Sequence, residues 1–242
     1  MLVTRKLSAL GPEELLAHLR EAELDEPEIL EVLRNPYCTL EIALTVGDSR
    51  RWTTSHVVRE LLVGFRGFPF ARAMNLLPTL PWTSLLQLAQ APSTPPVVKR
   101  QAEKKLLDRL VRMTLGEKTA LARRAHRPLF QRLIATADEQ VLTALLDNPR
   151  LVEVDVLVMV NTASAPRQFY FTLGRHHRWG LSYGVRLSLA TCPRTPLPLA
   201  LSAMVQLNPG DLRRIAEQPD VPERVQLAAQ ALCARRGIER GK

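Results

Sequence analysis

The sequence predicts an all-α fold, an α-solenoid of short paired helices built as two homologous halves. Only 5% of the 242 residues are aromatic, while leucine, alanine and arginine are abundant, a mixture that favours helices over sheets. Apolar residues recur three and four positions apart between proline-containing turns, which is the helical period. A tryptophan-centred stretch, RRWTTSHVVR at 50–59, returns as HRWGLSYGVR at 177–186.

The repeated stretch belongs to a longer internal duplication. Residues 51–102 and 178–229 share 15 identities in 52 positions without a gap. Matching residues, such as Arg51 and Arg178, are separated by the same number of positions throughout this window, and we call this constant separation the duplication offset. Self-similarity over such a length is typical of repeat architectures. A structural unit that occurs twice explains it more simply than a catalytic site built twice.

Upstream of this window the spacing between matching residues shortens. Asp25 matches Asp138, and several neighbouring residues match at the same separation. The two members of each of these pairs are separated by fewer positions than the duplication offset. The difference predicts a 14-residue insertion in the second half, within about 158–177. We therefore expect two halves, 1–112 and 113–242, joined in one continuous solenoid.

Within each half, proline marks the boundaries between helices. In chain order, the segments LLDNPRLVEVDVLVMV, ATCPRTPLPLALSAMVQL and LRRIAEQPDVPERVQLAAQAL each predict a helix, a turn with proline and a second helix, because proline starts a helix well but cannot continue one. In the last segment, Val225, Ala228, Ala229 and Leu232 form the stripe of a helix packed on one face. Such short helices must stack on their neighbours to form a core.

Two proline-containing segments resemble known repeats. QAPSTPPVV and EQPDVPERV, each followed by an alanine-containing helix, are similar to the bacterial leucine-rich-repeat-variant and HEAT-like repeats. The resemblance runs from about Leu24 to Arg236 and implies right-handed arrays of paired helices that serve mainly as binding scaffolds. The leucine-rich-repeat-variant type carries an N-terminal cysteine cluster for iron and sulfur, which this chain does not match, so the resemblance implies a fold and no cofactor.

Positive charge is concentrated where the two halves meet. The net charge is −2 for residues 1–98, +8 for 99–132 and +3 for 133–242. A basic patch of this kind can bind phosphates or an acidic protein surface; the alternative is a solvated helix face. The candidate electrostatic binding residues are Arg100, Lys104, Lys105, Arg112, Arg123, Arg124 and Arg127.

The duplicated tryptophans have two interpretations. Trp52 and Trp179 could stack on nucleobases. Alternatively, each fills the same contact between helices, with Arg59 and Arg186 bonded to a loop carbonyl or carboxylate. Because the whole frame is duplicated, we interpret all four residues as structural.

The predicted insertion contains the densest aromatic run of the chain. Phe169, Tyr170 and Phe171 are candidate apolar contacts for a partner, or else they fill a gap between repeats. His176 and His177 follow, but adjacent helical residues diverge by about 100° and seldom share one ion. No metal is therefore predicted.

Catalytic and cofactor signals are few. The sequence has no GxSxG, HExxH or glycine-rich phosphate loop, so we predict no catalytic or cofactor-binding residue. Its three cysteines are far apart, which favours neither a disulfide framework nor a zinc site. No apolar run reaches the length of about 20 residues of a membrane-spanning helix, and the N-terminus lacks a secretory signal core. We expect a reduced, cytoplasmic protein without a membrane partner.

The leading functional expectation is a non-catalytic scaffold that binds another macromolecule, most readily a protein. The alternative is a nucleic-acid-binding protein. The resemblance extends this alternative to a repair enzyme, because HEAT-like solenoids include alkylpurine DNA glycosylases, although their aspartate motif has no match here. Self-assembly through uncapped repeat ends is a third alternative, although both ends of the chain are polar.

Overall fold

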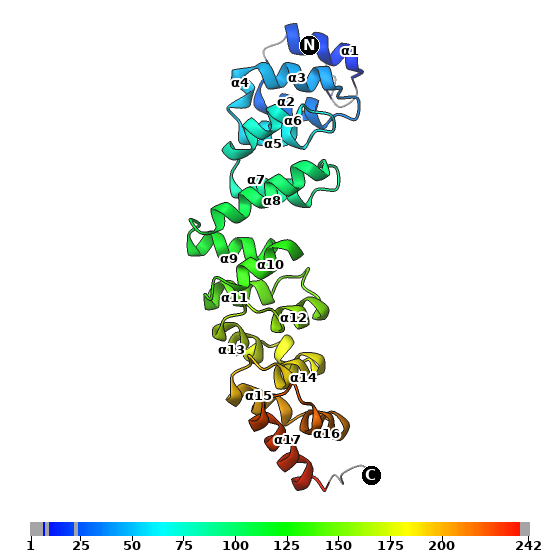
Figure 1. The fold of residues 1–242 in the computed structure, drawn as a ribbon. Helices are drawn as coiled ribbons and strands as arrows, with labels where there is room; N and C mark the ends of the chain where they lie inside the picture. Colours follow the sequence, from blue (N-terminus) through cyan, green and yellow to red (C-terminus); the bar gives the residue numbers. More distant parts are fainter. Residues whose placement is uncertain (1–6, 8–9, 22–23, 238–242) are drawn as a thin grey trace. The chain divides into compact units, whose positions relative to one another are not determined.

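The chain is helical throughout the part that the structure describes. The computed structural model describes Leu7, residues 10–21 and residues 24–237. These residues form seventeen α-helices together with the short 3₁₀ helices η2 and η3, and they contain no strand (Figure 1). The predicted all-α class is confirmed.

The chain divides into two compact units, Met1–Arg112 and Met113–Lys242, with the same bounds as the two expected halves. The helices of unit 1 are α1 (Pro12–Glu21), α2 (Glu26–Arg34), α3 (Leu40–Asp48), α4 (Arg50–Thr53), α5 (His56–Gly64), α6 (Phe70–Leu76), η2 (Leu77–Thr79), α7 (Trp82–Gln90) and α8 (Pro96–Leu110). The helices of unit 2 are α9 (Leu115–Arg124), α10 (Arg127–Ile134), α11 (Glu139–Leu146), α12 (Glu153–Val160), α13 (Arg167–Arg175), η3 (Trp179–Leu181), α14 (Tyr183–Thr191), α15 (Leu197–Met204), α16 (Pro209–Glu217) and α17 (Glu223–Arg235).

Local side-chain caps fix where many of these helices begin. The Asp25 carboxylate accepts the backbone N–H of Glu28 at 3.0 Å, and the Glu28 carboxylate accepts the N–H of Asp25 at 2.8 Å, which is a capping box. Ser55 and Ser182 accept backbone N–H groups at the starts of α5 and α14. Proline occupies the first turn of other helices, such as Pro96 in α8, where its missing N–H costs nothing.

In unit 1 the short helices are stabilised by their neighbours. α2 packs on α5, α5 on α7 and α7 on α8, while α1 packs on α3. The core between them is aliphatic, and Leu15, Ile29, Ile42, Leu62 and Leu85 are fully buried. Helices of 9 or 10 residues are marginal alone in water, whereas burial of each such side chain contributes about 1.5–3 kcal/mol.

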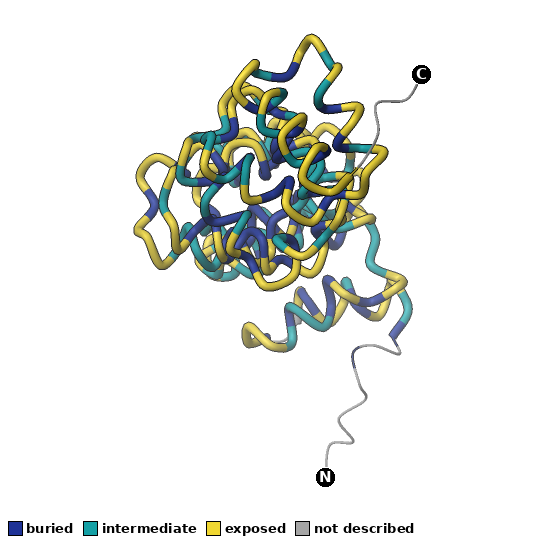
Figure 2. Tube along the Cα trace, turned by 90° about the horizontal axis from the view of Figure 1, so that it is seen from below, coloured by how far each residue is buried: buried dark blue, intermediate teal, exposed yellow. Residues whose placement is uncertain are grey.

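Unit 2 contains two rows of helices. α9, α11, α13, α15 and α17 pack one on the next, and α10, α12 and α14 form the second row. α16 packs on α17, and it is tied to α14 because the Tyr183 hydroxyl donates to the Asp211 carboxylate at 2.5 Å. Figure 2 shows buried residues alternating with exposed ones along the helices, as expected for helices that each pack on one face.

The starts of seven helices in unit 2 are related to those of seven helices in unit 1 by the duplication offset. The pairs are α1 with α11, α2 with α12, α3 with α13, α5 with α14, α6 with α15, α7 with α16 and α8 with α17. α9 and α10 precede this series and have no counterpart among the described helices of unit 1.

The expected 14-residue insertion does not fit these bounds. α13 lies inside the window 158–177, which the structure describes completely, yet its start is related to that of α3 by the duplication offset. Asp25 and Asp138, on which the insertion depended, cap α2 and α11, which hold different places in the series. The shorter spacing between these aspartates therefore reflects similar caps on two different helices, and the predicted insertion is wrong.

Candidate functional site

Trp179 is a structural residue of unit 2. Its indole Nε1 donates to the carbonyl oxygen of Leu146 at 2.8 Å, and the ring is buried. The Arg178 guanidinium covers the ring, 4.1 Å from its centroid. A ring enclosed in this way offers no face for a nucleobase.

Trp52 of unit 1 is more accessible. It is half-buried on α4 and lines a cavity of about 280 Å³ together with Glu26, Arg51 and Ser55. Its buried indole N–H has no acceptor among the described residues. Trp52 and Trp179 are therefore equivalent when the two halves of the sequence are compared, but their surroundings differ.

Arg59 and Arg186 join loops within their own units. Arg59 donates to the Thr79 hydroxyl at 2.6 Å. Arg186 donates to the carbonyl of Gly180 at 2.8 Å and to the amide oxygen of Gln206. These contacts make both arginines structural, although Thr79 and Gln206 accept through side chains that are not carboxylates.

A second pair of arginines with the same role was missed by the sequence reasoning. Arg109 donates to the carbonyls of Pro78 and Leu80. Arg236 donates to the carbonyl of Leu207 at 2.8 Å and to a second carbonyl two residues before it. The two arginines are related by the duplication offset, so extending the sequence comparison past residue 102 would have found them.

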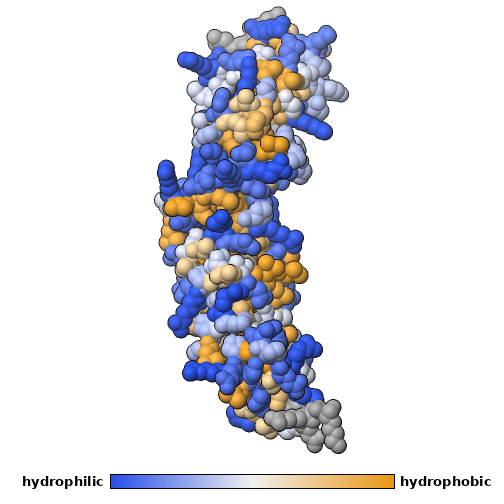
Figure 3. Space-filling view, viewed as in Figure 1, coloured by the Kyte–Doolittle hydropathy of each residue, from blue (hydrophilic) through white to orange (hydrophobic). Residues whose placement is uncertain are grey.

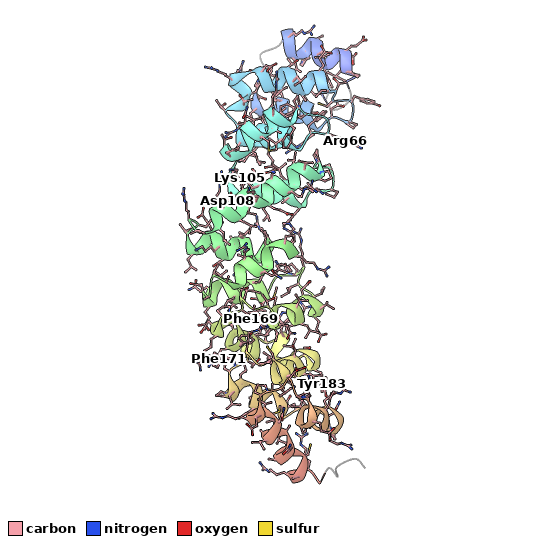
Figure 4. The ribbon with its side chains drawn as sticks, in the orientation of Figure 1. Arg66, Lys105, Asp108, Phe169, Phe171 and Tyr183 are labelled. Atoms are coloured by element: carbon pink, nitrogen blue, oxygen red, sulfur yellow. The ribbon has the colours of Figure 1, made fainter. Side chains whose placement is uncertain are left out.

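The aromatic run of α13 does not form a contact surface. Phe169 and Tyr170 are buried, with rings 5.7 Å apart, and the Tyr170 hydroxyl donates to the carbonyl of Val160 at 3.0 Å. Phe171 is half-buried beneath the Arg167 guanidinium (Figure 4). Phe169 and Tyr170 are therefore wrong as partner contacts, because a helix turns about 100° per residue and the core takes two of these three rings.

Four of the basic candidates belong to unit 1. Arg100 and Lys104 are exposed on one face of α8, Lys105 is half-buried, and Arg112 is exposed beyond the helix end. Asp108 follows Lys104 by about one helical turn and therefore lies on the same face of α8. This arrangement is a mixed, solvated helix face with an excess of positive charge.

The other three basic candidates belong to unit 2. Arg123 and Arg124 are exposed in the last turn of α9, where cations interact favourably with the helix dipole. The Arg127 side chain forms an ion pair with Asp155 at 2.8 Å. Arg127 therefore joins α10 to α12 while its side chain stays 70% exposed.

Four connections of unit 2 form a continuous edge, which we call the loop edge. It consists of the segments 125–126, 147–152, 176–182 and 205–208, which join α9 to α10, α11 to α12, α13 to α14 and α15 to α16.

Hydrogen bonds link each of these connections to the next. The buried amide of Asn148 donates to the carbonyls of Ala122 and Ala125 at 2.8 and 3.0 Å. Trp179 bonds to Leu146, as described above. Tyr183 then accepts the backbone N–H of Asn208 at 3.2 Å. The loop edge is thus held in one conformation by long-range hydrogen bonds.

The loop edge carries a concentration of cationic side chains. Exposed basic residues lie on it or at the helix ends that lead into it, and they are Arg123, Arg124, Arg150, Arg175 and Arg178. Its four segments contain one carboxylate, Asp147, which is bonded to His176 at 3.1 Å. The edge therefore favours anionic groups.

Apolar side chains are exposed beside these cations. Val152, Leu181 and Val205 are 43%, 69% and 55% exposed, each in a different connection or at its border. Val154 and Val158 of α12 are also exposed, and Figure 3 shows apolar atoms gathered over this helix. Sequence reasoning missed these residues, because EVDVLVMV gives no sign of which valines face the core.

Asp147, His176 and His177 are close enough to suggest a metal centre, with one ligand atom from each within 4.8 Å of the others. However, the Nδ1 atom of His176 accepts the backbone N–H groups of Arg178 and Trp179, both at 3.3 Å. The ring proton therefore sits on Nε2 and is donated to Asp147. A metal at Nε2 would force that proton onto Nδ1, against two N–H donors.

Burial lowers the pKa of His176, while the hydrogen bond to Asp147 partly opposes this effect. A neutral imidazole is the form that can accept at Nδ1 and donate at Nε2. His176 thus joins the connection between α13 and α14 to Asp147, directly after α11.

No family model, curated protein or solved structure matches the chain. None of the described helices has the length and apolar character required to cross a bilayer.

Proposed function

We propose that the chain is a non-catalytic binding scaffold of the α-helical repeat type, similar to HEAT-like and leucine-rich-repeat-variant arrays, and that its partner is a protein. In this proposal the scaffold arose by internal duplication, and its units are α-solenoids. Its three free cysteines agree with a reducing compartment.

Equivalent side-chain contacts support the duplication. The Ser55 hydroxyl donates to Glu26 at 2.7 Å, and Ser182 donates to Glu153. The two serines, like the two glutamates, are related by the duplication offset. Arg109 and Arg236, which each hold two carbonyls of the preceding connection, repeat at the same offset, so the recurrence includes interactions as well as helix bounds.

One observation carries the choice of a protein partner, namely the apolar surface of unit 2. This surface consists of Val152, Val154, Val158 and Leu181, all exposed, and Val205 is exposed in the next connection of the loop edge. Contiguous exposed apolar residues with a polar rim are characteristic of protein interaction sites. The Glu153–Ser182 hydrogen bond brings α12 next to the start of α14, so most of these side chains come from adjoining elements.

A nucleic-acid partner is the second candidate. The arginines of the loop edge favour it, because guanidinium groups bind phosphates in bidentate fashion. This candidate predicts binding that falls steeply with salt and that does not depend on the exposed valines and leucine.

Peptide selection on the immobilised full chain tests the proposal. Enriched peptides from a random library are synthesised, labelled and titrated by fluorescence anisotropy. We expect micromolar binding that weakens at least tenfold in the double variant Val154→Ser/Val158→Ser. The matched control is Leu227→Ser, on α17 and 55% exposed, which should change binding less than twofold.

Two results would contradict a protein-binding role. One is a selection that enriches no peptide. The other combines two observations. The selected peptides bind Val154→Ser/Val158→Ser as tightly as the parent, and oligonucleotides bind the chain tightly with a strong dependence on salt.

A further inference from the structure

We propose that the loop edge of unit 2 binds an extended acidic segment of the partner, whose carboxylates pair with the edge arginines and whose apolar side chains cover Val152, Leu181 and Val205. This inference rests on the proposed function and adds the chemical class of the partner and its place on the surface.

Charge on the edge selects an anionic partner. Arg123, Arg150, Arg175 and Arg178 are exposed there. Two carboxylates lie in the edge segments or at their border, Asp147, which is bonded to His176, and Glu153, which is bonded to Ser182. The exposed arginines outnumber these two carboxylates, so partner carboxylates meet an excess of guanidinium groups.

The apolar residues distinguish an acidic protein from a nucleic acid. A phosphate backbone has no apolar groups to cover Leu181, which is 69% exposed. Within the edge segments the Trp179 indole is buried under Arg178, and the exposed ring is the imidazole of His177. A single small imidazole is a limited stacking platform for bases, whereas leucine or valine side chains of a peptide can bury the exposed aliphatic groups.

The rigidity of the edge favours recognition. Asn148, Trp179 and Tyr183 each bond across to a neighbouring connection. The surface therefore loses little conformational entropy when a partner binds, and preorganisation of this kind increases affinity.

Repeat geometry sets the expected spacing in the partner. Packed helices lie about 8–10 Å apart, so neighbouring connections should present their side chains at a similar interval. The arginines lie at the first three connections, and the exposed apolar residues lie in the last three. An extended chain advances about 3.3 Å per residue. The partner should therefore place a residue that faces the edge about once every three residues, with carboxylates opposite the first three connections and apolar residues opposite the last three.

Fluorescence anisotropy with designed probes tests this inference on the full chain. The first probe is a peptide of about 12 residues, the length needed to cross four connections, with glutamate and leucine at three-residue spacing. The second replaces glutamate with lysine, the third replaces leucine with serine, and the fourth is a single-stranded oligonucleotide of similar length. We expect the first probe to bind in the micromolar range, and the second and third at least tenfold more weakly.

Two sets of variants locate the site. Arg123→Glu/Arg178→Glu and, separately, Leu181→Ser should each weaken the first probe at least tenfold. The matched control, Arg132→Glu/Leu227→Ser, changes an exposed arginine and an exposed leucine outside the edge and should leave binding within twofold. Thermal unfolding of each variant establishes that it is folded.

The outcomes separate this inference from the proposed function. Equal binding of the lysine peptide, still weakened by Leu181→Ser, would overturn the acidic partner but keep a protein scaffold. Tighter binding of the oligonucleotide, abolished by the arginine variant and unaffected by Leu181→Ser, would overturn both. The inference alone would be overturned if the first probe did not bind at micromolar concentrations while peptides from the random selection bound elsewhere on the chain.

Discussion

Replacement of Asn148 by alanine tests the hydrogen bonds that hold the loop edge. The side chain is fully buried. Its amide donates to the carbonyls of Ala122 and Ala125 at 2.8 and 3.0 Å, and its oxygen accepts the N–H of Arg150 at 2.9 Å. Alanine removes three hydrogen bonds and leaves buried polar groups without these partners.

The expected loss of stability follows from these three bonds. Each is worth about 0.5–1.5 kcal/mol net, and a buried group left unsatisfied costs about 1–3 kcal/mol. We therefore expect Asn148→Ala to lower the free energy of unfolding of unit 2 by about 3 kcal/mol. A change of that size should lower the melting temperature of a domain of this size by about 10 °C.

Urea denaturation followed by circular dichroism measures this loss. Asn148→Asp is an informative companion, because it keeps the acceptor for Arg150 but sets a carboxylate oxygen against two carbonyls. We expect it to be at least as destabilising as alanine. A loss below about 1 kcal/mol for alanine, or an aspartate variant as stable as the parent, would refute this role for Asn148.

Three further predictions concern packing, pH and thiol chemistry. Gly180→Ala should destabilise unit 2 by about 1–3 kcal/mol, because the added Cβ would lie 2.6 Å from a backbone carbonyl oxygen. Gly210→Ala should not destabilise it, because the nearest neighbour of that Cβ lies at 3.6 Å. Equal melting temperatures for the two variants would contradict this prediction. The lowered pKa of His176 means that its contribution to stability is present above about pH 6.5, the ordinary value, and is lost as the pH falls through the lower pKa of the folded state. The acid loss measured by melting scans should therefore be smaller in His176→Gln, and a parent-like acid profile in this variant would count against it. Burial raises the pKa of the Cys38 thiol to about 11, so alkylation by iodoacetamide near neutral pH should be much slower in the folded chain than in urea; similar rates would contradict this burial.

The helical architecture could be predicted from sequence because its signals are local. Proline and capping residues such as Asp25 and Ser55 act on the helix that they begin, and apolar periodicity marks the packed face. The false insertion arose from the same locality, because Asp25 and Asp138 are both good caps and a cap does not report which helix of the series it begins.

The candidate site could be predicted only in part, because it depends on direction and on distant contacts. Arg123 and Arg124 lie at the loop edge, but Phe169 and Tyr170 face the core. The order of residues in a dense aromatic run does not say which ring a helix buries. The bond from Trp179 to Leu146 spans 33 residues, and no local pattern predicts a contact of that length.

Photo-crosslinking of the full chain to the acidic peptide, with photo-leucine in place of leucine, tests whether the loop edge of unit 2 is the binding surface. We predict that mass spectrometry will find the crosslinks in residues 147–154, 176–183 and 205–208, and that Arg123→Glu/Arg178→Glu will abolish them. Crosslinks spread evenly over the chain, or concentrated on α8 of unit 1, would contradict the claim that the loop edge of unit 2 is the binding surface.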